Sequence, residues 1–395
     1  MRILFYTGKG GVGKTSVAAA TACALAAQGK RVLVMSTDQA HSLGDAFGVE
    51  LSGEPLQIQE NLYAEEIDVV SESEKAWGKL QGYLKELLIS HAQNGLEAEE
   101  LLVFPGLEEL FSLFKILDYY EGRGLPGREG AALDVLVVDC APTGETLSLL
   151  KFPEQFGNLM RTFLPVERKV VKVAGPAVER IAKLPMPKDD VFEELTLLVE
   201  KLERLQRLMN DRSVVSLRIV TTPEKIVIRE AKHNFTCLHL YGYQVDAVIV
   251  NRIYPRHALE GYFQAWIARQ EENMQELRES FGGIPLFTLE LQDHELQGIE
   301  ALERAAGLLY GEKDPMDIFF AGRIMKIEKQ GEKNVLKLSL PFAEKEETVL
   351  EASGSELVVT VRNEKRRFML PDTLKGKEVS GAAFRDGWLE VRFSL

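Results

Sequence analysis

Eight residues near the start of the chain have the types and the spacing of a phosphate-binding loop. The run Gly8-Lys9-Gly10-Gly11-Val12-Gly13-Lys14-Thr15 follows the pattern Gly-x-x-x-x-Gly-Lys-Thr. In such a loop the backbone N–H groups and the start of a helix surround the phosphates of a nucleotide. We therefore expect this run and Ser16 to bind nucleotide, with Lys14 at the β and γ phosphates and the Thr15 hydroxyl on Mg²⁺. A glycine turn that only joins a strand to a helix is the alternative.

Two aspartates follow apolar runs farther along the chain. Asp38 comes after the run Arg31 to Met35, and Asp139 closes the run Val135 to Val138. Hydrolysis of a phosphoanhydride needs a group that positions and deprotonates water, and Asp38 is the candidate for this general base. Asp139 is the candidate for the carboxylate that holds Mg²⁺ through water. The alternative for either aspartate is a helix cap.

The elements that must position these residues follow the order of an α/β fold with a central, mostly parallel sheet. An apolar run, the glycine loop, an Ala-rich helical segment and a second apolar run come first, and this alternation builds parallel strands. We expect a helix at Thr15 to Gln28 and strands at Ile3 to Tyr6, Arg31 to Met35, Leu133 to Val138, Leu217 to Val220 and Ala247 to Val250. Open sheets of this kind bind ligands at the carboxyl ends of their strands.

Two long segments between these strands have helical character. Residues 72–120 and 150–211 carry apolar side chains at helical spacing, which predicts a helical subdomain on the sheet domain. Its apolar surface is either ordinary core or an exposed groove for a client or a partner.

The pattern changes after Tyr310. Residues 311–321 are polar and rich in turn formers, and beyond them apolar and polar residues alternate, as they do from Leu336 to Leu340. We expect a P-loop domain at residues 1–310, a linker at 311–321 and a small all-β sandwich domain at 322–395.

Composition limits the class of protein. The net charge of −13 and the pI near 5.2 argue against a general nucleic-acid binder, because such proteins need a clustered basic surface. No apolar run approaches the roughly 18 residues of a membrane helix. The cysteines, Cys23, Cys140 and Cys237, are far apart, which fits a reducing compartment. We expect a soluble protein of the cytoplasm, or of the plastid stroma in a photosynthetic eukaryote.

Several motifs follow one another along the chain. They are the loop with its early lysine Lys9, Ser36 to Asp45, Pro105 to Glu109, Asp139 to Leu147, Pro223-Glu224 with Glu230, Val250 to Arg252, and Ile284 to Leu286. In this order they resemble the ArsA/Get family, which contains the arsenite-pump ATPase and the guided-entry ATPase for tail-anchored membrane proteins. The resemblance covers residues 1–310. The region from residue 322 onward resembles, more loosely, the small heat-shock (α-crystallin) domain that some members carry.

The resemblance implies a homodimeric ATPase that uses ATP and Mg²⁺. Lys9 then crosses the dimer interface to the partner's nucleotide and, with Lys14 and the base Asp38, belongs to the catalytic residues. Asp139 belongs to the second switch. The nucleoside contacts implied by the resemblance are Glu230, Asn251, Pro285 and Leu286.

The chain also departs from the family pattern. Gln39 stands where the family usually has Pro and Glu145 where it usually has His, so the switches are expected to respond differently to nucleotide. The zinc-binding Cys-x-x-Cys of the eukaryotic guided-entry dimer is missing, so we expect no zinc. The single glycine loop excludes the tandem architecture of the arsenite ATPase, and the scattered cysteines form no obvious site for a soft metalloid.

Together these features favour an ATPase that closes on ATP and then holds a hydrophobic client, such as the membrane segment of a tail-anchored protein. Two alternatives stay open. One is a subunit of a metalloid (arsenite) transport ATPase, and the other is a chaperone or scaffold that acts through the β domain under the control of nucleotide.

Overall fold

The computed structural model describes residues 1–38, 42–67, 107–124, 132–141, 144, 146, 147, 150, 151, 189–330 and 333–394. Some predictions fall outside these residues. They concern Gln39, Glu145, the motif that begins at Pro105, and residues 72–106 and 152–188 of the two helical segments.

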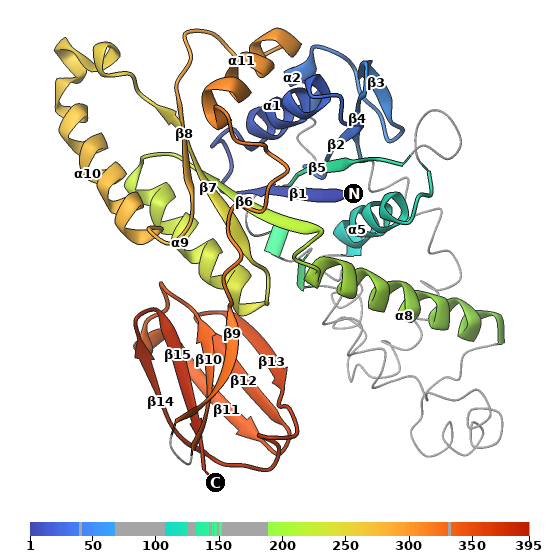
Figure 1. The fold of residues 1–395 in the computed structure, drawn as a ribbon, viewed down its shortest axis with the longest axis vertical. Helices are drawn as coiled ribbons and strands as arrows, with labels where there is room; N and C mark the ends of the chain where they lie inside the picture. Colours follow the sequence, from blue (N-terminus) through green and yellow to red (C-terminus); the bar gives the residue numbers. More distant parts are fainter. Residues whose placement is uncertain are drawn as a thin grey trace, which may run out of the picture.

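An eight-stranded sheet forms the centre of the first domain, in the order β3-β4-β2-β5-β1-β6-β7-β8 (Figure 1). Its strands are β1 Arg2–Thr7, β2 Val32–Ser36, β3 Leu56–Gln59, β4 Leu62–Glu66, β5 Val135–Asp139, β6 Val215–Thr221, β7 Val245–Ile253 and β8 Leu286–Glu290. Neighbouring strands are parallel, except that β3 and β4 pair antiparallel. The predicted α/β fold with a mostly parallel sheet is confirmed. Strands β3, β4 and β8 were not expected from the sequence.

Helices cover both faces of this sheet. One face carries α1 Lys14–Ala27, α2 Ser42–Phe47 and α11 Ile299–Tyr310, and the other carries α5 Leu107–Tyr120, α8 Asp189–Asn210, α9 Lys225–Leu240 and α10 Gln264–Ser280. The short helices η1 Arg256–Leu259 and η2 Gly261–Phe263 precede α10. Side chains of β1 alternate between the two cores, because Ile3 and Phe5 pack with α9 and its neighbours while Leu4 and Tyr6 pack with α1.

Helix α1 lies in close contact with the sheet and with α11. Its small side chains, including Ala18, Ala19 and Ala22, are fully buried and permit this approach. Because α1 is held on two sides, the glycine loop that precedes it has a fixed end.

The second domain is a sandwich of two antiparallel sheets, β14-β15-β10-β9 and β11-β12-β13. Its strands are β9 Met325–Gln330, β10 Lys333–Ser339, β11 Thr348–Ser353, β12 Glu356–Val361, β13 Glu364–Met369, β14 Val379–Arg385 and β15 Trp388–Phe393, with the short helix η3 Lys345–Glu347 before β11. Alternate residues such as Leu336, Val359 and Val391 are buried between the sheets. The predicted all-β sandwich is confirmed.

The sandwich packs against the C-terminal end of α9 (Figure 1). Phe342 of the sandwich meets Phe235 and Phe281 edge to face, at ring centroid distances of 5.7 and 5.2 Å. The Tyr241 hydroxyl donates to Glu364 Oε2 at 2.9 Å, and Arg366 Nη1 donates to the carbonyl of Leu240 at 2.7 Å. Apolar and polar contacts thus join the two domains.

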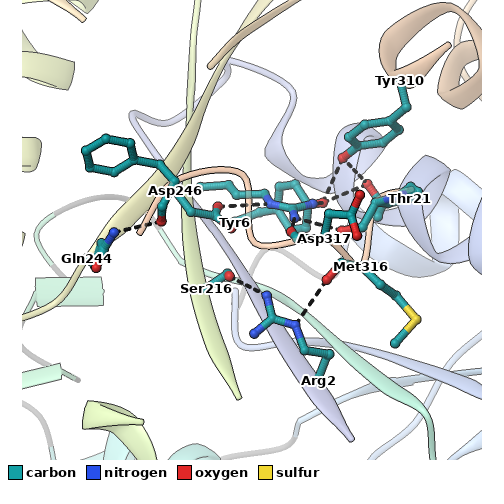
Figure 2. A network of polar contacts seen from close by, with 12 residues as sticks. Arg2, Tyr6, Thr21, Ser216, Gln244, Asp246, Tyr310, Met316 and Asp317 are labelled. Carbon is teal, nitrogen blue, oxygen red and sulfur yellow. Dashed lines mark hydrogen bonds and ion pairs between the residues drawn. The ribbon is translucent and has the colours of Figure 1, made fainter. Parts of the chain in front are cut away.

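A buried arginine of β6, Arg218, fastens the segment after α11 to the first domain. Its partners include Tyr6, Asp246 and Asp317, which belong to the polar network of Figure 2. Its Nη2 donates to the carbonyls of Pro315 and Asp317 at 2.7 and 3.3 Å, its Nη1 to the Tyr6 hydroxyl at 3.0 Å, and its Nε to Asp246 Oδ1 at 3.3 Å. The region predicted as a linker is therefore held at Pro315 and Asp317 by the core of the sheet domain.

Candidate active site

The glycine loop runs from the end of β1 to the start of α1 and depends on its glycines. Gly8 passes so close to β6 that a Cβ atom there would lie 2.2 Å from the carbonyl oxygen of Val220. Gly13 caps α1 in the left-handed conformation, with φ of 86°. Side chains at these positions would displace the loop, because neither the neighbouring backbone nor the conformation accommodates them.

A pocket of about 960 Å³ opens beside this loop, at the carboxyl end of the sheet. Its lining comes from the loop and α1, from Asp38 after β2, from the start of α2, from the end of β7 and from the segment after β8. The lining residues are Gly10, Gly11, Gly13, Lys14, Thr15, Ser16, Asp38, Ser42, Asp45, Ala46, Asn251, Arg252, Tyr254 and Glu290 to Gln297. The structure thus brings most of the predicted loop residues together with Asp38 and Asn251.

Lys14 is almost fully buried at the base of the pocket. Its side chain curls along the loop, and Nζ lies 3.5 Å from the carbonyl oxygen of Lys9. An ammonium group held there by one long hydrogen bond is available to an anion that enters the pocket.

Asp139 is fully buried at the end of β5, and neither of its carboxylate oxygens has a hydrogen-bond partner among the described residues. Burial raises its pKa to about 7, and the negative charge of Asp38 adds to this effect, while the nearby Thr15 hydroxyl and Lys14 ammonium act against it. A buried carboxylate without a strong partner is costly, so this position favours a cation or a donor that can satisfy it.

The Thr15 hydroxyl contacts a second hydroxyl, that of Ser42, with 3.0 Å between the oxygens. Mg²⁺ prefers oxygen ligands and keeps several waters, so two hydroxyls beside an unpartnered carboxylate fit this ion. Among the described residues no cluster of three His, Cys, Asp or Glu side chains could hold a metal.

The ends of β2 and β5 are tied to each other beside the pocket. The N–H of Thr37 donates to the carbonyl of Asp139 at 2.9 Å, and the N–H of Ala141 donates to the Thr37 hydroxyl at 3.3 Å. Asp38 follows directly, and its N–H donates to the Ser36 hydroxyl at 3.2 Å. A displacement of Asp38 would consequently be transmitted to the segment after Asp139.

Lys9 and Glu230 were predicted to contact nucleotide, and the structure brings them to each other. Lys9 Nζ lies 3.1 Å from Glu230 Oε2, and both side chains are about one-third exposed, at 37% and 35%. Neither lines the pocket of this single chain. Glu230 belongs to α9, so this ion pair joins the glycine loop to the helix on which the β sandwich docks.

Asn251 at the end of β7 is buried against the glycine loop. Its Nδ2 donates to the carbonyl of Val12 at 2.9 Å, and its Oδ1 accepts the N–H of Arg252 at 2.9 Å. The second N–H and the second lone pair of the Asn251 amide remain for the predicted contact with the nucleoside.

The structure places Pro285 and Leu286, the other predicted nucleoside contacts, away from the pocket. These residues stand at the start of β8, where Pro285 accepts a hydrogen bond from the N–H of Val248, and they do not line the pocket. The pocket lies at the other end of β8, where the chain from Glu290 to Gln297 forms its wall. The rule that ligands bind at the carboxyl ends of parallel strands would have pointed to that segment, had β8 been recognised.

Other pocket residues were not selected from the sequence. Ser42, Asp45 and Arg252 were noted only as parts of family patterns, and Tyr254 carries no motif. Their positions after β2 and β7, at the same edge of the sheet, were the available signal.

Comparison with known proteins identifies the family. The family model for anion-transporting ATPases matches residues 1–311, and a model for an HSP20-like domain found in ArsA matches residues 331–393. The chain belongs to the anion-transporting ATPase family. Its enzymatic activity is the hydrolysis of ATP to ADP and phosphate, and its second domain is HSP20-like.

Two relatives that match this ATPase span nearly the whole chain, and a third spans about three quarters of it. A protein of Chlorobaculum tepidum, named as an arsenical pump-driving ATPase, is 36% identical over 398 residues, which cover 100% of this chain and 96% of the relative. A protein of Aquifex aeolicus with a similar name is 36% identical over 388 residues, or 96% of each chain. ATPase GET3C of Arabidopsis thaliana is 27% identical over 320 residues, covering 77% of this chain and 81% of its own.

ATP hydrolysis agrees with the chemistry of the pocket. Its lining combines the buried Lys14 ammonium with the N-terminus of α1, and the buried carboxylate of Asp139 lies close to Lys14 and Thr15, which suits a polyphosphate with its divalent cation. In the described part of this ATPase, no helix has both the length and the apolar character to cross a bilayer.

Proposed function

We propose that this ATPase works as a homodimer in which ATP and Mg²⁺, bound at residues 8–16, close the two subunits around a hydrophobic client. The observation that carries the nucleotide site is Asp139, a buried carboxylate without a partner beside Lys14 and Thr15. Thr15, and Asp139 through water, would hold Mg²⁺, which would neutralise charge on the phosphates. Lys14 would contact the same phosphates, and Asp38 would position and deprotonate the attacking water.

The surface beside the pocket supports a dimer. Tyr254, Phe263, Trp266 and Leu291 are large apolar side chains that are 41% to 50% exposed. Tyr254 and Leu291 line the pocket, while Phe263 and Trp266 stand at the start of α10, the helix whose Gln270 hydrogen-bonds the backbone of Tyr254. Burial of such a patch against a second copy would stabilise a dimer that meets at the nucleotide. Lys9 would then exchange Glu230 for the partner's nucleotide.

The thiols of the chain argue against a metalloid site, although relatives are named for arsenical pumps. All three cysteines are free and buried, and burial raises the pKa of Cys23 and of Cys237 to about 12. A soft metalloid needs thiolates that it can reach. We therefore favour client binding over metalloid transport. The free thiols also favour a reducing compartment, such as the cytoplasm.

Control of the β sandwich by nucleotide is a second candidate function, favoured by one observation. Helix α9 carries Glu230, the partner of Lys9, and the same helix packs against Phe342 through Phe235. A change at the nucleotide loop would thus reach the sandwich through a single rigid element.

The test is nucleotide binding and dimerisation by the purified full-length protein. We expect Mg²⁺-dependent binding of ATP and a shift from monomer to dimer in light scattering when a non-hydrolysable analogue is added. The variant Lys9→Ala should bind ATP but dimerise poorly. Retention of a transmembrane peptide only with the analogue would support the client, whereas stimulation of turnover by arsenite would favour the metalloid alternative. A protein that retains no adenine nucleotide with Mg²⁺ would refute the site.

A further inference from the structure

Two consecutive residues at the end of β7 hold two consecutive carbonyl groups of the glycine loop. Asn251 Nδ2 donates to the carbonyl of Val12 at 2.9 Å, and Arg252 Nη1 donates to the carbonyl of Gly11 at 2.6 Å. Both side chains also line the pocket. The end of β7 therefore clamps the middle of the loop from one side.

A local irregularity in β7 makes this arrangement possible. Side chains that follow each other in a regular strand point to opposite faces, so two neighbours cannot both reach one loop. Here the pairing of β7 with β8 shifts between Val250 and Ile253, and Arg252 has a left-handed φ of 56°. That conformation is uncommon for a residue with a long side chain, and bulges of this kind re-aim side chains next to active sites.

The clamp determines where the loop amides point. In a trans peptide the N–H points opposite to the C=O, and the glycine loop, like the rest of the described residues, has no cis peptide. With the carbonyls of Gly11 and Val12 turned toward β7, the N–H groups of Val12 and Gly13 are directed away from it. Neither N–H has a hydrogen-bond partner among the described residues.

Gly13 completes the contact. A Cβ atom at this position would lie 2.4 Å from Asn251 Nδ2 and 3.8 Å from Arg252 Nε, so only glycine lets the clamp approach the loop. The absence of a side chain here thus serves the clamp as well as the left-handed turn at the start of α1.

We propose that Arg252 is a positioning residue for ATP hydrolysis, which orders the Val12 and Gly13 amides for a nucleotide polyphosphate by holding the carbonyl of Gly11. Asn251 holds the neighbouring carbonyl in the same way. The proposal rests on the proposed nucleotide site at residues 8–16. Arg252 acts through the loop and not on the nucleoside, so its loss should weaken the binding of phosphates and leave the binding of the nucleoside unchanged.

Three substitutions of Arg252 separate this role from general effects of charge and folding. Arg252→Gly removes the donor and suits the left-handed backbone, so the turn itself is kept. Arg252→Gln removes the charge but keeps an N–H donor, and Arg252→Lys keeps the charge and a donor. For each variant, calorimetry would give the dissociation constants of ATP, ADP and adenosine, and steady-state assays would give kcat and KM.

We expect Arg252→Gly to bind ATP and ADP about tenfold more weakly, the effect of losing one hydrogen bond that preorganises the site. Adenosine affinity should stay within about twofold, and the melting temperature should not fall, since glycine relieves the left-handed strain. Arg252→Gln should recover part of the ATP affinity, and Arg252→Lys should do the same.

Three results would overturn the role of Arg252. The first is an unchanged ATP affinity in Arg252→Gly, and the second is an equal loss of ATP and adenosine affinity in that variant. The third is an Arg252→Gln variant that binds ATP as weakly as Arg252→Gly while Arg252→Lys binds it normally, which would show that only the charge matters. If the unmodified protein bound no ATP, the nucleotide site itself would be refuted. If the unmodified protein bound ATP and Arg252→Gly bound it equally well, only the clamp would be refuted.

Discussion

Asp139 and Arg218 are two buried charged residues on the same row of the central sheet, and their surroundings are opposite. Both pair in register with Tyr6 of β1, Asp139 from β5 and Arg218 from β6. Every nitrogen of the Arg218 guanidinium donates a hydrogen bond, whereas neither oxygen of Asp139 has a partner in the described part of the chain.

This difference distinguishes a structural charge from a functional one. A satisfied buried cluster fixes the chain that surrounds it, here the segment after α11 and the end of β1. An unsatisfied buried carboxylate destabilises the free protein and is relieved when a ligand arrives. The free energy of unfolding should therefore fall when the Arg218 cluster is changed and rise when Asp139 is changed. Turnover, in contrast, should depend on Asp139.

The largest effect is expected from Arg218→Met. It leaves Asp246 buried without its cation and frees the carbonyls of Pro315 and Asp317, so the free energy of unfolding should fall by about 3–5 kcal/mol. Urea denaturation at pH 7.5 measures this loss. The double variant Arg218→Met/Asp246→Leu is the control and should regain much of it, because no buried charge is left alone. A loss in the single variant no greater than in the double one would contradict the comparison.

The charge of Asp139 should make stability depend on pH. Its pKa is about 7 in the folded chain against 3.8 in an unfolded one, so the folded state binds more protons between these values. Stability should therefore fall as pH rises from 4 to above 7, by an amount of the order of 4 kcal/mol. Asp139→Asn should abolish this slope and raise stability at pH 8, with loss of Mg²⁺-dependent turnover.

Denaturation curves at several pH values, without nucleotide, test this expectation. An Asp139→Asn variant that is less stable than the unmodified protein at pH 8 would show that the carboxylate is satisfied in the free chain. Addition of Mg²⁺ and ADP should reduce the difference between the two proteins, because the ligand compensates the buried charge.

Replacement of the proposed base should affect rate alone. Asp38→Asn should lower kcat by about 10²-fold, since the variant cannot accept the proton of the attacking water. ATP affinity and the melting temperature should stay close to those of the unmodified protein. Single-turnover hydrolysis measures the rate, and calorimetry measures the ATP affinity and the melting temperature. Normal turnover in Asp38→Asn would remove Asp38 from this role.

The smallest effect on stability should come from the pair formed by Lys9 and Glu230. Both side chains are partly exposed, so Glu230→Gln should change the free energy of unfolding by less than about 1 kcal/mol. Lys9→Ala should be equally mild for stability but should lower turnover, if Lys9 serves the partner's nucleotide. Equal turnover in Lys9→Ala and in the unmodified protein would leave this ion pair as a surface contact only.

Local spacing in the sequence was sufficient for the glycine loop, for the parallel strands on either side of it and for the all-β pattern of the second domain. Each of these features is a pattern among a few neighbouring residues, so it can be recognised in the sequence alone. The place of Asp38 in the pocket also followed from its position after a strand, because the carboxyl ends of parallel strands share one edge. Asn251 was assigned from the family resemblance.

The tertiary structure alone decided which distant residues complete the site. Pro285 was assigned to the nucleoside, although it lies at the start of β8 and the pocket lies at the other end of that strand. The wall from Glu290 to Gln297 follows β8, a strand that the alternation of apolar and polar residues did not predict. The left-handed turn at Arg252 and the burial of Arg218 were equally hidden, since arginine usually signals a solvated surface. Strand order and burial bring such residues together, and neither is encoded in the spacing of neighbours along the chain.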